Sequence, residues 1–155
     1  MSQLDQINEL NSETKCRLGV SKIHGVGVFA IQDIKCGDKL GLHPRQIAKW
    51  YHIPWGSLSK LYPEVKEIIL DRWPSVINGS EFLAPNDDTI MLLYVNHSEE
   101  ANYLAKTDQA LIDIKKGQEI VEDYRLMANW QTVFPWLQTV DKPTLKDKLA
   151  KYLKF

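Results

Sequence analysis

The stretch Ile23–Ala30, IHGVGVFA, decides the fold more than any other part of the chain. Its two glycines precede a run of β-branched and aromatic residues, a composition that favours a tight turn leading into a β-strand. A dinucleotide-binding fingerprint would need a third glycine three residues after the second, and none stands there. The pattern therefore predicts strand, turn and strand over residues 17–42, with a further tight turn at Cys36 and Gly37.

The remaining pattern extends this hairpin into a β-rich α+β fold with a helical insert and a helical C-terminal tail. Pro63 and Glu64 suit a first helical turn, and Pro74 would stop the same helix. Thr144 and Asp147 form a capping-box pattern at the start of a tail helix. The sequence indicates no internal repeat. Strands are expected at 90–95, 110–114 and 119–124, and helices within 1–14, over 63–72 and from 144 onward.

Composition and charge narrow the class of protein. A chain of 155 residues can form one domain with one sizeable core. The 19 basic and 20 acidic residues leave a net charge of -1, which gives no electrostatic basis for direct nucleic-acid binding. The two cysteines form no CxxC pair, so no metal site is expected. A polar N-terminus and the lack of a membrane-length apolar run indicate a cytoplasmic protein, or a nuclear one if the source is eukaryotic.

Two further stretches carry polar side chains beside strand-like runs: LLYVNHSEEANY, residues 92–103, and DIKKGQEIVEDYR, residues 113–125. Asn96 offers two hydrogen-bond donors and one acceptor, and Tyr124 offers a phenol that can orient an amine. Taken alone, Asn96 is typical of a satisfied turn residue, and Tyr124 of an ordinary edge aromatic. Their functional interpretation depends on their combination with the glycine turn.

In this order and approximate spacing, the three stretches resemble the SET-domain protein lysine methyltransferases. The glycine turn matches the opening motif of that family, the stretch around NHS matches its NHS-x-x-P-N motif, and IDIKKGQEIVEDY matches its closing motif. The resemblance covers roughly residues 16–124. Three positions depart from the pattern: Glu99 stands where a cysteine is frequent, Ala101 replaces the proline, and Gln118 replaces one of two acids. None of them belongs to the methyl-transfer machinery of the family.

The resemblance implies small β-clip-like sheets with a pseudoknot-like crossing, in which the segment bearing NHS passes beneath the closing segment. The implied SET domain spans 15–125 with a helical insert at about 43–80, between an N-terminal leader (1–14) and a C-terminal flanking segment (126–155). S-adenosyl-L-methionine is the implied cofactor, and Tyr124 the implied catalytic residue. Glycines in the turn would let the backbone approach the cofactor where a Cβ would clash. The implied cofactor contacts are His24, Gly25, Val26, Gly27, Asn96 through its side chain, His97 mainly through its backbone, Tyr124 and Trp130.

The lysine channel and its cap are less well defined by the sequence. No cysteine cluster follows Tyr124, so a zinc-bound cap of the kind found in many family members is not expected. Aromatic side chains after Tyr124 could close the pocket instead, or could pack onto the core. A second channel tyrosine is usual in the family, and several tyrosines qualify. The cap candidates are Trp130, Phe134 and Trp136, and the tyrosine candidates are Tyr94 as a catalytic residue, Tyr103 and Tyr62 as substrate contacts, and Tyr51.

The resemblance also implies a partner, namely a protein or peptide that presents a lysine side chain and binds between the insert and the closing strand, partly by strand addition. Two other hypotheses stay open: a catalytically inactive SET-fold module that binds or scaffolds, and a dimeric interaction protein assembled through the tail helix. Retention of Asn96, His97 and Tyr124 favours the enzyme, because an inactive copy is free to lose them. The oligomeric state and the identity of the lysine are left open.

Overall fold

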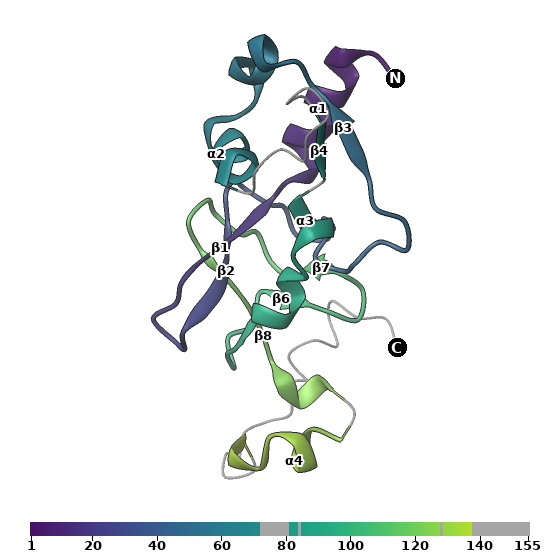
Figure 1. Ribbon diagram of the computed structural model, residues 1–155. Coiled ribbons are helices and arrows are strands. Elements are labelled where there is room, and N and C mark those ends of the chain that lie inside the picture. The colour runs from purple at the N-terminus through teal and green to yellow at the C-terminus, as the bar shows by residue number, and fades with distance from the viewer. Residues whose placement is uncertain (72–80, 84, 128, 138–155) are drawn as a thin grey trace.

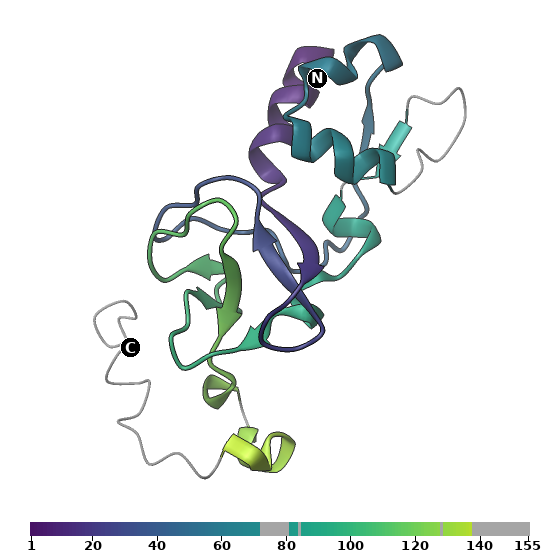
Figure 2. The same ribbon diagram turned by 90° about the vertical axis from the view of Figure 1, so that its left-hand side faces the viewer.

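The computed structural model describes residues 1–71, 81–83, 85–127 and 129–137. Two helices lie at one end of the molecule, a four-stranded sheet lies in the middle, and a short helix lies at the other end (Figures 1 and 2). The elements are α1 (Gln3–Glu13), β1 (Cys16–Val20), β2 (Val26–Ala30), β3 (Trp50–His52), η1 (Trp55–Lys60), α2 (Pro63–Asp71), β4 (Glu81–Leu83), α3 (Pro85–Asp88), η2 (Met91–Tyr94), β5 (Asn96–His97), β6 (Tyr103–Leu104), β7 (Gln109–Ala110), β8 (Glu119–Glu122), η3 (Tyr124–Leu126), α4 (Trp130–Val133) and η4 (Pro135–Leu137), where η denotes a 3-10 helix.

The four-stranded sheet has the order β1-β2-β8-β5, and two-stranded sheets pair β3 with β4 and β6 with β7. The β1-β2 hairpin is antiparallel, with Val20 opposite Val26, and the Ser21 N–H closes its turn on the Gly25 carbonyl at 2.8 Å. Gly25 has a φ of 48°, a left-handed conformation that costs other residues more. The prediction of strand, turn and strand around residues 23–30 is therefore confirmed.

Two turns, residues 33–38 and 113–118, are hydrogen-bonded to each other through an isolated β-bridge between Ile34 and Ile114. We call them the turn pair. Both have the sequence Asp-Ile-Lys-x-Gly, so the chain does contain a short internal repeat that the sequence analysis missed. Each aspartate caps the backbone of the opposite turn. The matched contacts are Ile34 and Ile114, which exchange backbone hydrogen bonds of 2.8 Å in both directions, Asp33 accepting the Lys116 N–H at 2.9 Å, Asp113 accepting the Cys36 N–H at 2.9 Å, and Gly37 and Gly117, both with a φ of 88°.

Helix α1 is an integral part of the fold. Ser2 and Asp5 form a capping box at its start. Ile7 and Leu10 are buried in a hydrophobic cluster shared with β3, η1 and α2. The Asn11 side chain accepts the Tyr62 N–H at 2.8 Å and donates to the Lys60 carbonyl at 3.3 Å. The short N-terminal helix expected within 1–14 therefore exists, and it packs against the insert.

A second hydrophobic cluster fills the space between the sheet and the small β6-β7 hairpin, and it contains Val28, Ile120 and Tyr103. The two clusters meet at the end of β2, because Ala30 belongs to the sheet cluster whereas Ile31 belongs to the cluster around α1. Each turn of the turn pair contributes an isoleucine to the sheet cluster. The central sheet thus holds the two halves of the molecule together.

The helix predicted over 63–72 is confirmed, since α2 begins at Pro63, ends at Asp71 and buries Val65, Ile68 and Ile69. The predicted strand at 90–95 is wrong, because Met91–Tyr94 forms the 3-10 helix η2 and the strand β5 begins only at Asn96. A short apolar run carries too little periodicity to separate the two conformations. The expected tail helix from Thr144 lies outside the described residues. Within the described ranges, no helix is long and apolar enough to cross a membrane.

Candidate active site

Three stretches that are far apart in the sequence meet beside the β5-β8 strand pair. Strand β5 runs parallel to β8, with Asn96 opposite Val121 and His97 opposite Glu122. Strand β8 also pairs with β2, which follows directly from the glycine turn. Tyr124 begins η3, two residues after β8 ends. The pairing therefore brings the glycine turn, the NHS segment and the closing segment into one region.

Asn96 joins the glycine turn to this region through its side chain. Its Nδ2 donates to the carbonyl oxygens of His24 at 3.1 Å and Val26 at 3.2 Å. It also donates to Oε1 of Glu119 at 2.9 Å. Asn96 is buried, so these contacts satisfy an amide that would be costly to leave unpaired. The amide of Asn96 thereby fixes the position of the turn.

Gly27 is needed because another side chain occupies the space beside it. A Cβ at Gly27 would lie 2.3 Å from Oε1 of Glu119 and 3.1 Å from Cβ of Ser21. The Glu119 carboxylate accepts hydrogen bonds from the Ser21 hydroxyl at 2.8 and 3.0 Å, in addition to the bond from Asn96. In this structure the group that lies close to the Gly27 backbone is thus the Glu119 carboxylate. A contact of Gly27 with the cofactor stays a prediction.

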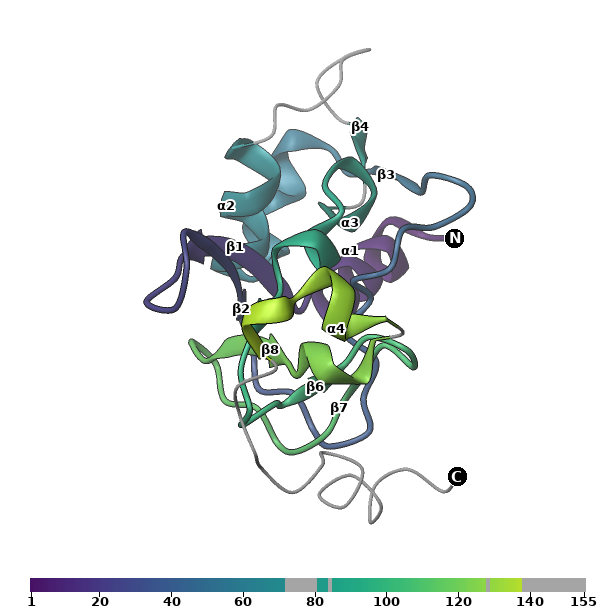
Figure 3. The ribbon, with the colours of Figure 1, turned by 90° about the horizontal axis from the view of Figure 1, so that it is seen from below.

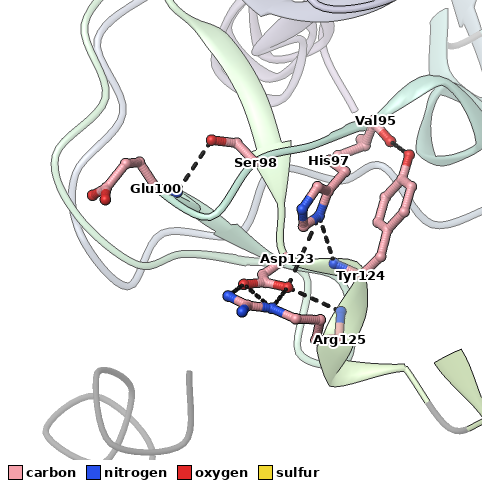
Figure 4. Close-up of polar contacts among 7 residues, drawn as sticks. All are labelled: Val95, His97, Ser98, Glu100, Asp123, Tyr124 and Arg125. Carbon is pink, nitrogen blue, oxygen red and sulfur yellow. Dashed lines mark hydrogen bonds and ion pairs between the residues drawn. The ribbon is translucent and has the colours of Figure 1, made fainter. Parts of the chain in front are cut away.

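The His97 ring accepts a hydrogen bond from the backbone of the closing segment. The N–H of Tyr124 donates to His97 Nδ1 at 3.1 Å (Figure 4). An acceptor nitrogen carries no proton, so this bond requires the neutral imidazole with its proton on Nε2. Burial lowers the pKa of His97, which agrees with the neutral form, although the nearby Asp123 acts in the opposite direction.

Asp123 and Arg125 form an ion pair beneath His97. Asp123 is 0% exposed, and Nε of Arg125 donates to both of its carboxylate oxygens, at 2.9 and 3.0 Å. The Arg125 backbone N–H also donates to Asp123, at 2.9 Å. Oδ1 of Asp123 lies 3.9 Å from His97 Nδ1, but its charge is already balanced by Arg125. The sequence analysis did not single out this pair, although an acid and an arginine two residues apart at the end of a strand are visible in the sequence.

The hydroxyl of Tyr124 donates to the Val95 carbonyl at 2.6 Å. Burial, together with the charge of Glu122, raises the pKa of Tyr124, so the side chain is a neutral phenol. Its ring lies 4.6 Å from the Phe134 ring and 5.2 Å from the His97 ring, between centroids. The Trp136 ring packs against the edge of His97 at 5.7 Å and is 58% exposed. The segment after β8 therefore covers Tyr124 with aromatic rings.

The other predicted cofactor contacts lie near this region in different environments. His24, Gly25 and Val26 are exposed at the tip of the β1-β2 hairpin, and the first and last are tied to Asn96 through their carbonyls. Trp130 is half-buried at the start of α4. The ring contacts at Tyr124 and His97 involve Phe134 and Trp136, two residues for which the sequence analysis had proposed a capping role.

The tyrosine candidates separate clearly. Tyr94 lies exposed in η2, directly before the Val95 carbonyl that binds Tyr124. Tyr62 is exposed between η1 and α2, and α2 lies toward the end of the molecule opposite α4 (Figures 1 and 2). Tyr103 is 0% exposed, and its hydroxyl donates to Asp108 at 2.9 Å, so the structure places it in the core and not on a surface that a substrate could reach. Of these three tyrosines, Tyr94 is the one adjacent in sequence to a residue that Tyr124 contacts.

Asn102 is a structural contributor that the sequence analysis named only as part of a motif. Its side chain donates to the Glu119 carbonyl at 2.8 Å and accepts the Val121 N–H at 2.8 Å. Its backbone N–H donates to the Val121 carbonyl at 3.1 Å. Asn102 therefore bonds to the backbone of β8 as a neighbouring strand would, and it fixes the position of the Glu119 backbone. An asparagine is suited to this role because its amide reproduces a peptide group.

Comparisons with known proteins found similar solved structures. A Plasmodium falciparum protein assigned as a histone methyltransferase matches with 20% identity and a TM-score of 0.37, over 76% of this chain and 97% of that protein's chain. The SET domain of the tumor suppressor RIZ1 (PRDM2) matches with 18% identity and a TM-score of 0.33, over 84% of this chain and 82% of that domain. No protein-family model and no curated protein matches the sequence. Both TM-scores lie below 0.5, so neither likeness assigns a function to this chain.

Proposed function

We propose that this protein transfers a methyl group from S-adenosyl-L-methionine to the side-chain amine of a lysine in a protein substrate. The observation that carries the proposal is the meeting of the glycine turn, Asn96 and Tyr124 around the parallel β5-β8 pair. These are the residues whose order in the sequence resembles the SET-domain methyltransferases, and their convergence into one region is what such an enzyme requires. The proposed partner is a lysine-bearing protein or peptide.

The residues around Tyr124 suit the chemistry of this cofactor in part. Exposed aromatic rings such as Trp136 attract a sulfonium cation and stack on adenine. The exposed turn at Gly25 offers peptide groups without a side chain in the way. The amide of Asn96, however, is engaged by His24 and Val26, so a direct contact of that amide with the cofactor would require exchange of these bonds. We propose that Asn96 acts first by holding the turn.

The bound cofactor supplies an electrophilic methyl carbon, and the chain must present a neutral amine to it. A free lysine has a pKa of about 10.4, which a desolvated channel lowers by disfavouring the ammonium. The hydroxyl proton of Tyr124 is directed to the Val95 carbonyl, so the lone pairs of its oxygen remain available to accept an N–H of an amine. Accepting one N–H of the amine would turn the nitrogen lone pair in a fixed direction. Such positioning can supply a large part of the rate.

The test combines cofactor binding with methyl transfer. Titration calorimetry of the purified protein with S-adenosyl-L-methionine should show saturable one-to-one binding that Asn96→Ala weakens. Incubation with the tritiated cofactor and an array of lysine-bearing peptides should label a subset of peptides, and Tyr124→Phe should reduce this labelling while binding of the cofactor persists. Tyr62→Phe, between η1 and α2, is the matched control and should change neither result. Wild-type protein that neither binds the cofactor nor labels any peptide would contradict the proposal.

A second candidate function is a SET-like binding module without catalysis. It is favoured by the fact that Nδ2 of Asn96 and the hydroxyl of Tyr124 are both satisfied inside the chain. In that case Asn96→Ala and Tyr124→Phe would lower the thermal stability of the protein, and the wild-type protein would bind no cofactor. The calorimetric titration therefore separates the two functions.

A further inference from the structure

Strand β1 has a free edge. It is the first strand in the sheet order β1-β2-β8-β5, and β2 is its partner along one side. The Ile31 N–H donates to the Lys15 carbonyl, and the Ser21 N–H donates to the Gly25 carbonyl, each at 2.8 Å. These two bonds fix the register, so odd-numbered residues of β1 bond to β2 and the N–H and C=O groups of even-numbered residues point outward.

The outward groups of Leu18 and Val20 enter no hydrogen bond with any part of the chain that the structure describes. The Val20 side chain, at the end of β1, is 90% exposed. Unpaired edges of this kind are templates for an added strand unless charge, proline or a covering element protects them. No proline lies within β1.

A slot runs along this edge. A cavity of about 70 Å³ is lined by residues 16–18 of β1 on one side and by Ile68, Asp71, Pro85 and Met91 on the other. Three consecutive residues of a strand line it, so the cavity borders the strand edge and not only one face of the sheet. Figure 3 shows β1 on the side of the sheet that faces α2. The volume is enough for a small aliphatic side chain.

The slot carries a negative charge at one end. Asp71 is the last residue of α2, its carboxylate is exposed, and no ion pair or hydrogen bond to it occurs within the described ranges. A carboxylate at the C-terminal end of a helix is unfavourable for the helix dipole, and the last turn of α2 holds no basic residue to offset it. The nearby Glu67 is paired with Arg17 at 3.2 Å, so of these two carboxylates only that of Asp71 has no ion pair within the described ranges.

From the free edge, the cavity and this charge, we propose that β1 captures an extended segment of a partner protein as an added strand. The segment would place a small aliphatic side chain in the cavity and a lysine or arginine against Asp71, and would pair its backbone with Leu18 and Val20. This docking surface goes beyond the proposed methyl transfer, because it requires neither the cofactor nor Tyr124. Failure of one proposal would leave the other standing.

The substitution Val20→Pro changes the hydrogen bonding of the free edge of β1 and of no other part of the sheet. Val20→Pro removes an outward N–H and leaves the bonds between β1 and β2 in place, and the side chain it replaces is exposed. Val20→Thr keeps the N–H and the β-branched shape, and is the matched control. A thermal melt of each variant establishes that both fold.

A displayed library of random octapeptides, selected on the full-length wild-type protein, supplies the probe. Selected peptides should alternate aliphatic and polar residues and carry a basic residue. By fluorescence anisotropy, the best peptide should bind Val20→Pro about tenfold more weakly and Val20→Thr equally well, as expected for loss of a backbone hydrogen bond. Asp71→Lys should weaken binding, and replacing the basic residue of the peptide by glutamate should restore it in that variant.

Two results would overturn this docking site. Selected peptides that bind Val20→Pro and wild-type protein with equal affinity, or the absence of any selected peptide, would show that the edge is not a peptide site. A wild-type protein that sediments as a dimer and a Val20→Pro variant that sediments as a monomer would show that the occupant of the edge is a second copy of the chain.

Discussion

The lack of a side chain at Gly27 leaves room for the Glu119 carboxylate, which accepts hydrogen bonds from Asn96 and Ser21. An added Cβ there would lie 2.3 Å from the Glu119 carboxylate, which would have to move away from Asn96 and Ser21. We expect Gly27→Ala to lower the free energy of unfolding by about 0.5–1.5 kcal/mol for each hydrogen bond of Glu119 that is lost. Urea denaturation followed by circular dichroism measures this change.

A second pair of variants tests whether displacement of the Glu119 carboxylate, and not alanine itself, causes the destabilisation by Gly27→Ala. In a Glu119→Ala background the obstructing carboxylate is gone, so Gly27→Ala should cost much less there than in the wild type. Gly56→Ala, where the added Cβ meets no atom within 4 Å, should have little effect. Equal costs of Gly27→Ala in both backgrounds would show that the space beside Gly27 is not limited by Glu119.

His97 predicts a pH dependence near the lower end of the neutral range. Its pKa is lowered in the folded state from an ordinary value of 6.5, so the unfolded chain takes up the proton first as the pH falls. The free energy of unfolding should therefore be unaffected by this group above pH 6.5 and should decrease as the pH falls from there through the folded pKa. Protonation would also remove the acceptor for the Tyr124 N–H.

The variant His97→Asn isolates this contribution. An asparagine oxygen can accept the Tyr124 N–H from a position close to that of Nδ1, and it does not titrate between pH 5 and 7. Urea midpoints measured across this range should therefore vary less with pH in the variant than in the wild type. His24→Asn, the same substitution at the exposed hairpin tip, is the variant for comparison. Identical profiles for wild type and His97→Asn would contradict the assignment.

At the scale of elements, α1 is expected to contribute directly to stability. Leu10 is buried in the cluster around the insert, and Leu4 on the same helix is exposed. Leu10→Ala should lower the free energy of unfolding by about 2–5 kcal/mol through lost burial and the cavity left behind. Leu4→Ala should change it by no more than about 0.5 kcal/mol. Comparable effects of the two substitutions in urea denaturation would show that α1 does not pack as described.

The turn pair predicts matched effects from two distant positions. Asp33 and Asp113 each accept a backbone N–H of the opposite turn, and this bond is the main cause that lowers each pKa from its ordinary value of 3.8. The stabilisation is therefore present above pH 3.8 and is lost as the pH falls through the lower folded pKa values. Asp33→Ala and Asp113→Ala should shift the urea midpoint equally at pH 7, and both shifts should become smaller as the pH falls below 3.8. Clearly unequal shifts at pH 7 would contradict the symmetry.

For the whole molecule, the two hydrophobic clusters should unfold together. They share the end of β2, where Ala30 and Ile31 face different clusters, so neither can be lost without disturbing the central sheet. Urea unfolding followed by circular dichroism and by tryptophan fluorescence should give superimposable curves. Leu10→Ala and Ile120→Ala, one in each cluster, should shift both curves together. Separate transitions would show that the halves are independent.

The sequence predicts the hairpin at residues 23–30 and the helix at Pro63 because both depend on neighbouring residues. Glycines set the turn, and a proline with apolar spacing sets the helix start. It does not predict η2, because Met91–Tyr94 is an apolar run whose conformation is decided by packing onto β1 and β2. A sequence pattern therefore predicts a helix or strand when the residues of that segment determine its conformation, and fails when packing against other segments determines it.

In the candidate site, too, the sequence predicts what a local motif contains and not what contacts between distant segments decide. The sequence singled out Asn96, His97 and Tyr124 through a motif, and the structure brings them together. It could not show that Tyr103 is a core residue, since exposure depends on the residues packed around it. Nor could it show that Gly27 faces Glu119, because the two residues are far apart in the sequence, on strands β2 and β8, and only the folded sheet brings them together.

The turn pair has a consequence for the order in which the protein is made. The contacts between its two halves join residues 77 to 83 positions apart, so the first turn leaves the ribosome long before its partner. At about 5–20 residues per second, the wait is roughly 4–16 s. During that interval Asp33 has no backbone of the second turn to cap, and β2 has no β8 beside it. A newborn chain is therefore exposed to proteases and chaperones until residues 113–118 have emerged and the turn pair can form.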